Sequence, residues 1–389
     1  MAEEVVIVSA ARTPIGKFGK SLRGLSAEQL GTIAAKAAIT RSGLDPATIQ
    51  QTIFGSVLQA GQGQNIARQI ELNAGLPVTS TAMTINQVCG SSLKAIRLGQ
   101  SAILMGDADI VLVGGTESMS NAPYLTPQTR WGHKFGDITL TDSLAHDGLT
   151  DAFTDIPMGI TAENVAAQFH ISRADQDAFA LRSQRRATAA QQANRFADEI
   201  VPVSLGTTTL TTDEAVRTTT SREQLAALRP AFKSVGTVTA GNAAGLNDGA
   251  AAMILMKKST ARAAGIAYLA TLRGYQEVGI DPAIMGYAPV TAIQQLLTKT
   301  QRSVSDIDRF ELNEAFAAQS VAVGQALALP DDRLNVNGGA IALGHPLGAS
   351  GTRIVVTLLY ELLHSGTHLG VASMCIGGGM GMALMIESN

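Results

Sequence analysis

The sequence predicts an α/β fold made of two copies of one α/β unit, with a different segment inserted between them. Equivalent segments recur at a nearly constant spacing along the chain, which indicates a duplication. The middle of the chain lacks the long hydrophobic strands found on either side of it, which indicates an insertion. The length of 389 residues and the hydrophobic content of 46% suit a large duplicated core.

The first copy begins with an apolar, β-branched run at residues 5–8, which predicts a strand. Residues 26–39 have the amphipathic pattern of a helix. A connector rich in cap and turn residues follows at 44–49, and residues 53–58 again predict a strand.

The second copy repeats this order. Residues 268–272 predict a strand, 288–297 a helix, 304–307 the connector and 310–313 the next strand. The two connectors end at Ile49 and Ile307, which are 258 residues apart.

A second pair of segments matches more closely. Residues 89–92 open an apolar helix that runs to 103, and the strand 110–113 then enters a glycine turn. Residues 348–351 likewise open a helix that runs to 363, and the strand 371–376 enters a second glycine turn. Cys89 and Gly348 are 259 residues apart, and Gly115 and Gly377 are 262 apart. The alternative is that any α/β chain shows strands and helices at similar spacing.

The stretch from about 121 to 241 contains the only tryptophan, Trp131, a basic cluster at 182–186 and a threonine-rich segment at 207–220. We expect it to cover one edge of the duplicated core, over the active site. The predicted division is therefore 1–120 with 242–267, then 121–241, then 268–389.

Composition excludes several classes of protein. A formal charge of −3, from 29 basic and 32 acidic residues, argues against a nucleic-acid-binding protein. Two cysteines exclude a disulfide scaffold and favour a cytoplasmic protein, and no basic segment of the signal-peptide kind opens the chain. Residues 362–386 contain no Asp, Glu, Lys or Arg, but six glycines interrupt them, so we interpret them as a buried strand between glycine turns and expect no membrane helix.

Cys89 is the first candidate for chemistry. It lies where an apolar strand ends and a helix begins, and the positive end of a helix dipole favours the reactive thiolate over the thiol. The alternative is an inert, buried small side chain, which is the commoner role of a free cysteine.

Three further segments carry candidate residues. His345 lies in a glycine-crowded loop, which suits an imidazole held against a ligand but also a surface histidine. Cys375 ends the last apolar strand ahead of three glycines, whose N–H groups suit an oxyanion, although a core thiol is the alternative. Asn313 and Glu314 follow another strand, where such a pair can orient a water or a carbonyl, although the sequence alone favours a helix cap.

Common ligand motifs are missing. The cysteines are 286 positions apart with no paired Cys/His spacing, so we expect no metal site. Neither the P-loop pattern nor the glycine fingerprint of dinucleotide-binding strands is present, which removes the simplest NTPase and dinucleotide interpretations.

Taken together, the motifs resemble the thiolase family over nearly the whole chain. They occur in the family's order, at residues 9–14, 86–91, 114–120, 147–151, 161–164, 239–242, 313–316, 337–340, 344–346 and 375–379. Within the family, the nearest resemblance is to bacterial acetyl-CoA acetyltransferases, which join two acetyl-CoA molecules.

The resemblance implies a duplicated βαβαβαββ core in five α-β-α-β-α layers with an inserted loop domain that binds coenzyme A. It implies that Cys89 takes an acetyl group and that Cys375 deprotonates the second acetyl-CoA. His345 would activate Cys89 and, with a water held by Asn313, form one oxyanion hole. The N–H groups of Cys89 and Gly377 would form the other. Coenzyme A is then substrate and product, and no cofactor is expected.

The resemblance also implies contacts to coenzyme A and the acyl group. Arg217 matches an arginine that lies against the adenine, with a solvated surface arginine as the alternative, and Met158 and Met285 match positions at the acyl pocket, with core filling as the alternative. The full set of implied binding residues is Arg217, Leu149, Met158, Phe232, Ala240, Ala244, Met285 and Ala315.

Three positions depart from the family pattern. Pro157 stands where many short-chain thiolases have histidine, Ala244 replaces a serine that often contacts pantetheine, and Gln224 replaces another serine. These changes affect coenzyme A contacts and chain length, and none of them is a proposed catalytic residue.

Other functions fit less well. A degradative 3-ketoacyl-CoA thiolase with a broader chain length would use the same catalytic residues, so the acyl pocket decides between the two. A ketoacyl synthase needs no second cysteine base, and a non-catalytic acyl-CoA-binding protein should have lost Cys89 or Cys375, yet both are present. The family suggests a homodimer or homotetramer.

Overall fold

The computed structural model describes residues 3–389. Its first part contains, in order, β1 (Val5–Arg12), β2 (Gly16–Lys17), α1 (Ala27–Ser42), β3 (Gln51–Gly55), α2 (Ile66–Asn73), β4 (Thr81–Ile85), α3 (Ser91–Met105) and β5 (Ile110–Ser118). A long segment separates β5 from the next core elements, β10 (Asn247–Lys257) and α7 (Lys258–Ala263). The last part contains β11 (Ala270–Gly279), α8 (Ala288–Lys299), β12 (Arg309–Leu312), α9 (Ala317–Leu327), α10 (Ala340–Leu343), α11 (Ser350–Ser365), β13 (Leu369–Ile376) and β14 (Met380–Ser388).

The strands confirm the duplication. One strand order is β3-β5-β10-β1 and the other is β12-β13-β14-β11. In each, the first pair is parallel and the next two pairs are antiparallel. The two orders differ at one end, because β4 adds a parallel strand beside β3, whereas the same place beside β12 holds only an isolated bridge between Phe310 and Leu334.

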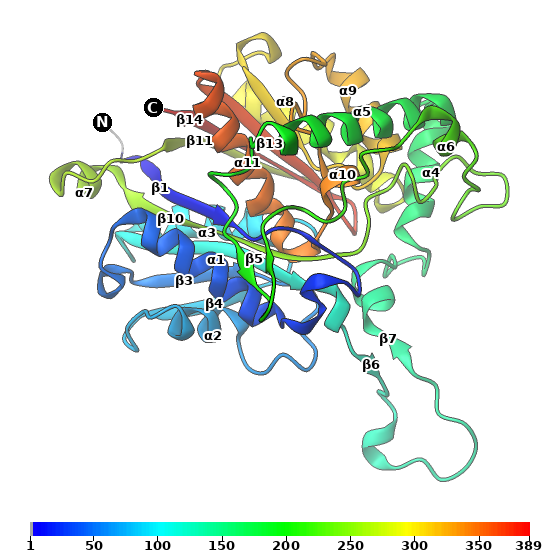
Figure 1. The fold of residues 1–389 in the computed structure, drawn as a ribbon, viewed down its shortest axis with the longest axis horizontal. Coiled ribbons are helices and arrows are strands. Elements are labelled where there is room, and N and C mark those ends of the chain that lie inside the picture. The colour runs from blue at the N-terminus through cyan, green and yellow to red at the C-terminus, as the bar shows by residue number, and fades with distance from the viewer. Residues whose placement is uncertain (1–2) are drawn as a thin grey trace.

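The core is built in five layers (Figure 1). Helices α1 and α2 cover the outside of the first group of strands, and α8 covers the outside of the second. Between the two groups lie α3 and α11, which contact each other and the strands on both sides. Within residues 3–389 the two groups of strands pair with each other at β1 and β11, through the pairs Val6–Thr271 and Ile7–Ala270.

Local sequence explains where the helices begin and end. Helix α1 starts at a capping box in which the Ser26 hydroxyl accepts from the Gln29 N–H, and it ends at Gly43 in the left-handed conformation. Its buried face is formed by small and aliphatic side chains (Leu30, Ala34, Ala35 and Ala38), which lets it lie close to the strands.

The two central helices and β5 meet at glycines, one in the first turn of α11 and one on β5. A Cβ atom on Gly351 of α11 would lie 2.3 Å from the backbone nitrogen of Leu93 in α3. A Cβ atom on Gly115 would lie 2.1 Å from the carbonyl oxygen of Gly348. Only glycine allows this approach, which brings the residues preceding α3 and α11 to the same place.

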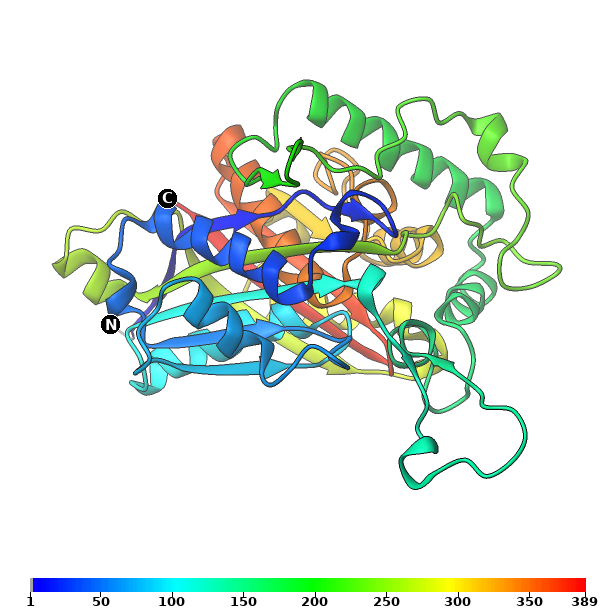
Figure 2. The same cartoon turned by 60° about the horizontal axis from the view of Figure 1, so that its bottom comes forward.

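The segment between β5 and β10 is built differently from the two copies of the core. It consists of short strand pairs and three helices: β6 (Tyr124–Leu125), β7 (Thr141–Asp142), α4 (Met158–Gln168), α5 (Arg173–Gln192), β8 (Val203–Ser204), β9 (Thr209–Leu210) and α6 (Arg222–Ala226). Helix α5 packs on α9 and α10. The loop between β6 and β7 projects away from the rest of the molecule (Figures 1 and 2).

Some predicted bounds were wrong. Strand β3 ends at Gly55 rather than at residue 58, because the N–H groups of Val57 and Leu58 bond to a side chain instead of a strand. Residues 362–386 are not one strand: they hold the end of α11 and the strands β13 and most of β14, which pair with each other. Across residues 3–389, no helix has the length and apolar character needed to cross a membrane.

Candidate active site

Cys89 lies in a tight turn between β4 and α3. Its neighbour Val88 has φ of +46°, a conformation that is rare for a β-branched residue and that costs backbone strain. Gly90 is the residue before the first turn of α3. The Cys89 side chain is buried, and the backbone N–H groups of Gly377 and of Cys89 itself act on its sulfur to lower the thiol pKa.

The environment of Cys89 changes the expectation for its protonation state. The helix end led us to expect a thiolate. Instead, burial raises the pKa of the Cys89 thiol to about 11, with a smaller contribution from the charge of the Glu117 carboxylate. The two backbone N–H groups lower the pKa and offset only part of this rise. The expected direction was wrong, because the cost of burying a charge exceeds the stabilisation from the helix end. A thiolate must therefore form together with proton transfer to a base.

His345 is buried beside this turn, ahead of the short helical turn 347–349. Its Nδ1 atom lies 2.5 Å from Ser350 Oγ, and Ser350 Oγ donates to the Pro346 carbonyl at 2.9 Å. The Ser350 hydroxyl therefore accepts from Nδ1–H, which leaves Nε2 as the acceptor nitrogen of the ring. Burial, assisted by the charge of Arg353, lowers the pKa of His345 to about 3, so the imidazole is neutral.

Asn313 faces the acceptor nitrogen of His345. The Asn313 side chain is fully buried, and its Nδ2 atom donates to His345 Nε2 at 3.5 Å. Its Oδ1 atom is buried and has no hydrogen-bond partner among residues 3–389, which suits a bound water. The helix-cap interpretation was wrong: α9 begins at Ala317, and Phe316 is its cap residue.

Cys375 is the last residue but one of β13 and is buried against Met285 and Ala315. Burial raises the pKa of the Cys375 thiol, and the neighbouring Cys89 raises it further. The glycines that follow, Gly377 to Gly379, turn the chain back into β14, with φ above +80° at Gly378 and Gly379.

A narrow cavity of about 60 Å³ lies in front of Cys89 and His345, whereas Asn313, Cys375 and Gly377 are not among the residues that line it. Cys89 and His345 line it together with predominantly apolar side chains from several segments. The other lining residues are Val88, Met119, Gly148, Leu149, Met158, Ala244, Gly245, Leu246, Met285, Ala315, Phe316 and Leu347.

Comparison with protein families decides the relationship. A sequence model of the thiolase N-terminal domain matches residues 5–259, and a model of the thiolase C-terminal domain matches residues 266–388. The chain belongs to the thiolase family. This thiolase is 51% identical to an acetyl-CoA acetyltransferase of Chromobacterium violaceum over 389 residues, covering 99% of both chains. It is 50% identical to an acetyl-CoA acetyltransferase of Cupriavidus necator over the same length, again with 99% of both covered.

Solved structures agree with this relationship. Bacillus anthracis acetyl-CoA acetyltransferase superimposes with a TM-score of 0.97 at 41% identity, covering 100% of this chain and 99% of that chain. Human mitochondrial 3-ketoacyl-CoA thiolase in complex with CoA gives a TM-score of 0.97 at 45% identity, covering 100% and 98%. The fold is thus shared by an enzyme named acetyl-CoA acetyltransferase and by one named 3-ketoacyl-CoA thiolase.

Most binding residues implied by the resemblance lie at the cavity of this thiolase. Leu149, Met158, Ala244, Met285 and Ala315 line it. Phe232 does not line the cavity, but its ring packs edge-on against the ring of Phe316, which does; the two ring centroids are 6.3 Å apart. Ala240 and Arg217 are exposed and are not among the residues lining the cavity.

Sequence reasoning missed several residues of the site. Val88, Met119 and Phe316 lie within or beside the motifs, so proximity to a motif was the available signal. Glu117 lies in the same motif as Met119, at 114–120, and so carried the same signal. Ser350 had no such signal, because a polar residue that opens a helix has many other uses.

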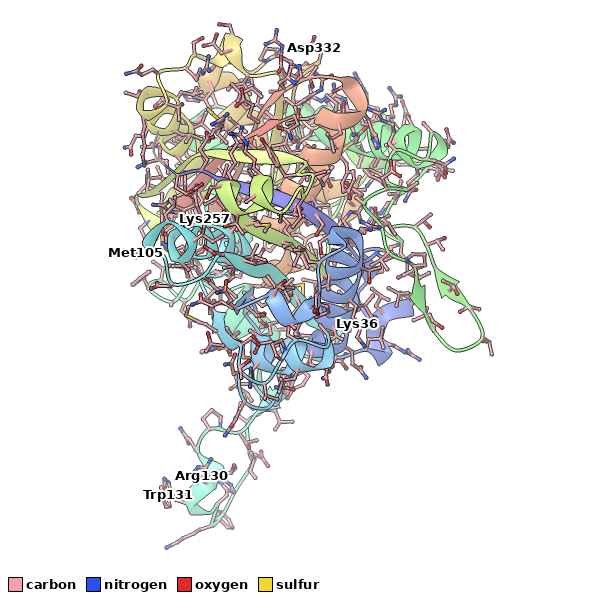
Figure 3. All side chains as sticks on the ribbon, turned by 90° about the vertical axis from the view of Figure 1, so that its left-hand side faces the viewer. Lys36, Met105, Arg130, Trp131, Lys257 and Asp332 are labelled. Carbon is pink, nitrogen blue, oxygen red and sulfur yellow. The ribbon has the colours of Figure 1, made fainter. Side chains whose placement is uncertain are left out.

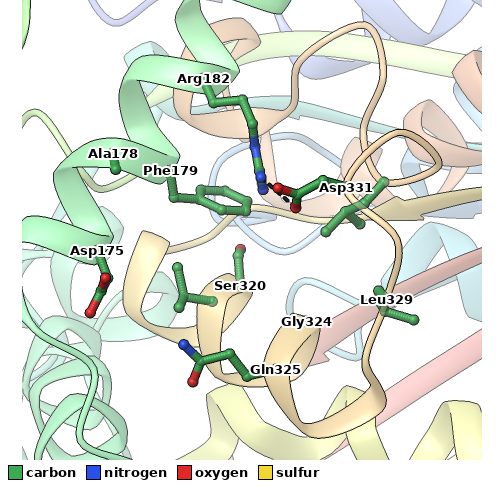
Figure 4. Close-up of a pocket in the computed structure, with 11 residues that line it drawn as sticks. Asp175, Ala178, Phe179, Arg182, Ser320, Gly324, Gln325, Leu329 and Asp331 are labelled. Carbon is green, nitrogen blue, oxygen red and sulfur yellow. Dashed lines mark ion pairs between the residues drawn. The ribbon is translucent and has the colours of Figure 1, made fainter.

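A larger hollow of about 550 Å³ lies elsewhere, between α5 and α9 (Figure 4). Arg182 and Asp331 form an ion pair in it, 2.5 Å between Nη1 and Oδ1. None of the catalytic candidates lines this hollow. Within residues 3–389, no group of three or more His, Cys, Asp and Glu side chains is placed to hold a metal ion.

Proposed function

We propose that this thiolase is an acetyl-CoA C-acetyltransferase, which condenses two acetyl-CoA into acetoacetyl-CoA and CoA and also runs in reverse. The observation that carries the proposal is that two buried thiols, one from each copy of the core, lie near each other. Cys89 lines the narrow cavity beside a neutral imidazole, and Cys375 packs against Met285 and Ala315, which line the same cavity. The relatives that are about half identical over their full length and are named acetyl-CoA acetyltransferase support the substrate.

In the first half-reaction His345 Nε2 takes the proton of Cys89, and the Cys89 sulfur attacks the carbonyl carbon of acetyl-CoA. The bond between that carbon and the CoA sulfur breaks. The leaving CoA thiolate takes the proton of Cys375, so CoA departs as a thiol and Cys375 becomes a thiolate. The protonated His345 Nε2 then becomes a hydrogen-bond donor toward a thioester oxygen.

In the second half-reaction the Cys375 thiolate removes a methyl proton from a second acetyl-CoA. A thiol whose pKa is raised by burial gives a strongly basic thiolate, which suits removal of a proton from carbon. The carbanion attacks the acetyl carbon on Cys89, a carbon–carbon bond forms, and the bond from that carbon to the Cys89 sulfur breaks. Cys89 recovers its proton from His345.

Two sets of donors suit the oxygens that become negative. The unpartnered Asn313 Oδ1 supports a water held beside His345 Nε2 as one oxyanion hole. The N–H groups of Gly377 and Cys89, which lower the pKa of the Cys89 thiol, support the second, for the acetyl oxygen on that sulfur.

A degradative 3-ketoacyl-CoA thiolase is the alternative, and the small apolar cavity argues against it. The deciding experiment measures kcat/KM for thiolysis of acetoacetyl-CoA and of 3-ketohexanoyl-CoA. We expect a preference for acetoacetyl-CoA of at least roughly tenfold, about 1.4 kcal/mol in transition-state binding. Comparable values would favour the degradative enzyme.

The assembly we propose is a homodimer or homotetramer. Strand β4 lies at the end of the strand order, and open edge strands pair readily with other chains. On the projecting loop, Trp131 is 91% exposed and Phe135 96% exposed, which is typical of a contact surface (Figure 3). Sedimentation of the wild-type protein and of a Trp131→Ser variant would test this.

The remaining assignments are also proposals. The enzyme works in the cytoplasm, needs no cofactor beyond the coenzyme A that is its substrate and product, and divides at 1–120 with 242–267, 121–241 and 268–389. The middle segment contributes most coenzyme A contacts, Arg217 and Ala240 among them.

A further inference from the structure

Glu117 is a buried carboxylate next to the proposed site that the reaction above does not use. It lies on β5 with no exposed surface, and it forms no ion pair with any residue in 3–389. Both of its oxygens accept from backbone N–H groups. Val57 and Gly348 donate to Oε2 at 3.0 and 2.8 Å, and Leu58 donates to Oε1 at 3.1 Å.

These three donors belong to two separate loops. Val57 and Leu58 follow β3, whereas Gly348 lies in the turn that follows His345. The loops converge on Gly148 at the cavity: a Cβ atom there would lie 3.0 Å from Leu347 Cδ1 and 3.5 Å from Leu58 Cδ2. Glu117 thus joins the segment carrying His345 and Leu347 to the opposite loop.

The carboxylate and the turn fit without spare room. A Cβ atom on Gly348 would lie 2.8 Å from Glu117 Oε2, so the turn approaches the carboxylate with its bare backbone. A glutamine would have nearly the same shape but only one acceptor oxygen. Its NH₂ group would face at least one backbone N–H, and two donors cannot bond to each other.

Keeping an anion here is costly. Burial raises the pKa of Glu117 to about 7, the charge of Asp248 on β10 adds to the shift, and the three N–H groups oppose it. A buried carboxylate without a cation persists where its hydrogen bonds organise the structure.

We propose that Glu117 is a positioning residue for the acyl transfer, whose carboxylate holds the His345 turn against the loop after β3 and so fixes His345 at Cys89. This inference rests on the proposed function, since it assumes that His345 activates Cys89.

The test measures the single-turnover rate of Cys89 acetylation by acetyl-CoA, followed by mass spectrometry, in wild type and in Glu117→Gln. We expect the variant to be slowed at least ~10-fold, because misplacing a base by a fraction of an ångström slows transfer strongly. Glu71→Gln is the matched control. Glu71 is also fully buried but pairs with Arg68 on α2, away from the cavity, and this variant should acetylate at the wild-type rate.

The pH profile separates positioning from a general loss of stability. Besides the backbone donors, the titratable groups around Glu117 are Asp248 on β10, Cys89 ahead of α3 and His345 ahead of the 347–349 turn. The pKa values of Cys89 and His345, about 11 and about 3, lie far from that of Glu117, about 7. Burial also raises the pKa of Asp248, but a step caused by Asp248 would persist in Glu117→Gln, which keeps that residue. Wild-type acetylation should therefore slow as the pH falls through about 7, where Glu117 gains a proton and loses an acceptor. Glu117→Gln should lack this step, and Glu117→Asp should retain it at a lower rate.

The outcomes are distinct. Acetylation at the wild-type rate with the same pH step in Glu117→Gln would overturn the positioning role alone. A wild-type protein that forms no acetyl-Cys89 would overturn the proposed function and this inference with it. If Glu117→Gln does not fold, Glu117→Asp decides: a rate equal to wild type would contradict the inference, and a slowed rate that keeps the pH step would support it.

Discussion

The Nδ1 atom of His345 and the Oγ atom of Ser350 lie 2.5 Å apart, and the Ser350 hydroxyl donates onward to the Pro346 carbonyl. This arrangement makes Ser350 an acceptor toward the imidazole and assigns the ring hydrogen to Nδ1. The side of the ring that faces Asn313 is thereby kept as a base.

Ser350→Ala removes that acceptor. We expect acetylation of Cys89 to slow at least about tenfold, because the buried Nδ1–H loses its partner and the other tautomer becomes populated. Rapid quenching with mass spectrometry measures the rate. Ser9→Ala, which removes another buried hydroxyl bonded to a backbone carbonyl, is the control and should leave the rate unchanged.

Cys375→Ser should separate the two half-reactions. Cys89 should still become acetylated in this variant, whereas condensation should fall at least roughly 100-fold because serine is a poor base at this position. Peptide mass spectrometry locates the adduct, and acetoacetyl-CoA formation reports condensation. An adduct found on Cys375 in the wild-type protein, with none on Cys89, would reverse the assigned roles.

His345 should make the fold sensitive to acid. Its pKa is lowered from 6.5 to about 3 on folding, so the stability that the neutral ring provides is present above about 6.5 and is lost as the pH falls toward 3. Between pH 8 and pH 5 we expect the wild-type free energy of unfolding to fall by roughly 2 kcal/mol more than that of His345→Asn. Urea denaturation of both proteins at the two pH values measures the difference. Equal losses would place a protonated imidazole in the folded protein.

Met158→Ala should lengthen the acyl pocket. Met158 lines the cavity, and each methylene that a longer substrate buries there contributes about 0.8 kcal/mol. The preference for acetoacetyl-CoA over 3-ketohexanoyl-CoA in kcat/KM should shrink. Met105→Ala, at the exposed end of α3, serves as the control and should leave the preference as it is.

Arg217→Ala tests the proposed contact to the nucleotide of coenzyme A. The Arg217 side chain is exposed, and its backbone N–H is held by Gln184 at 2.8 Å, so truncation leaves the backbone supported. We expect KM for coenzyme A to rise several-fold with kcat nearly unchanged, as for binding energy lost equally from ground and transition states. Arg222→Ala, also exposed, should change neither constant. An unchanged KM in Arg217→Ala would remove that residue from the site.

Much of the fold could be predicted because each copy carries its own local signals. A helix cap such as Ser26 depends on residues close to it in the sequence. The duplication is visible because the local pattern around Ile49 recurs around Ile307. Cys89 and Cys375 could be identified as candidates because each follows an apolar strand pattern in the sequence and precedes glycine.

What could not be predicted depends on contacts between distant segments. The pKa of Cys89 is set by burial, which appears only when α3 packs against the second copy. The Glu117 carboxylate accepts a hydrogen bond from the N–H of Gly348, which is 231 residues away, and the sequence pattern of β5 does not predict that contact. The end of β3 at Gly55 has the same cause, since the next N–H groups are drawn to Glu117.

The glycine contacts beside α3 and α11 also show how the two copies have diverged. Cys89 precedes α3, whereas the corresponding position ahead of α11 is Gly348. The bare backbone of Gly348 lets the turn after His345 lie against β5 and Glu117. The second thiol, Cys375, comes from a different position in its copy, near the end of β13. One structural unit used twice thus supplies two different parts of the site, because equivalent positions hold a proposed nucleophile in one copy and a closely packed turn in the other.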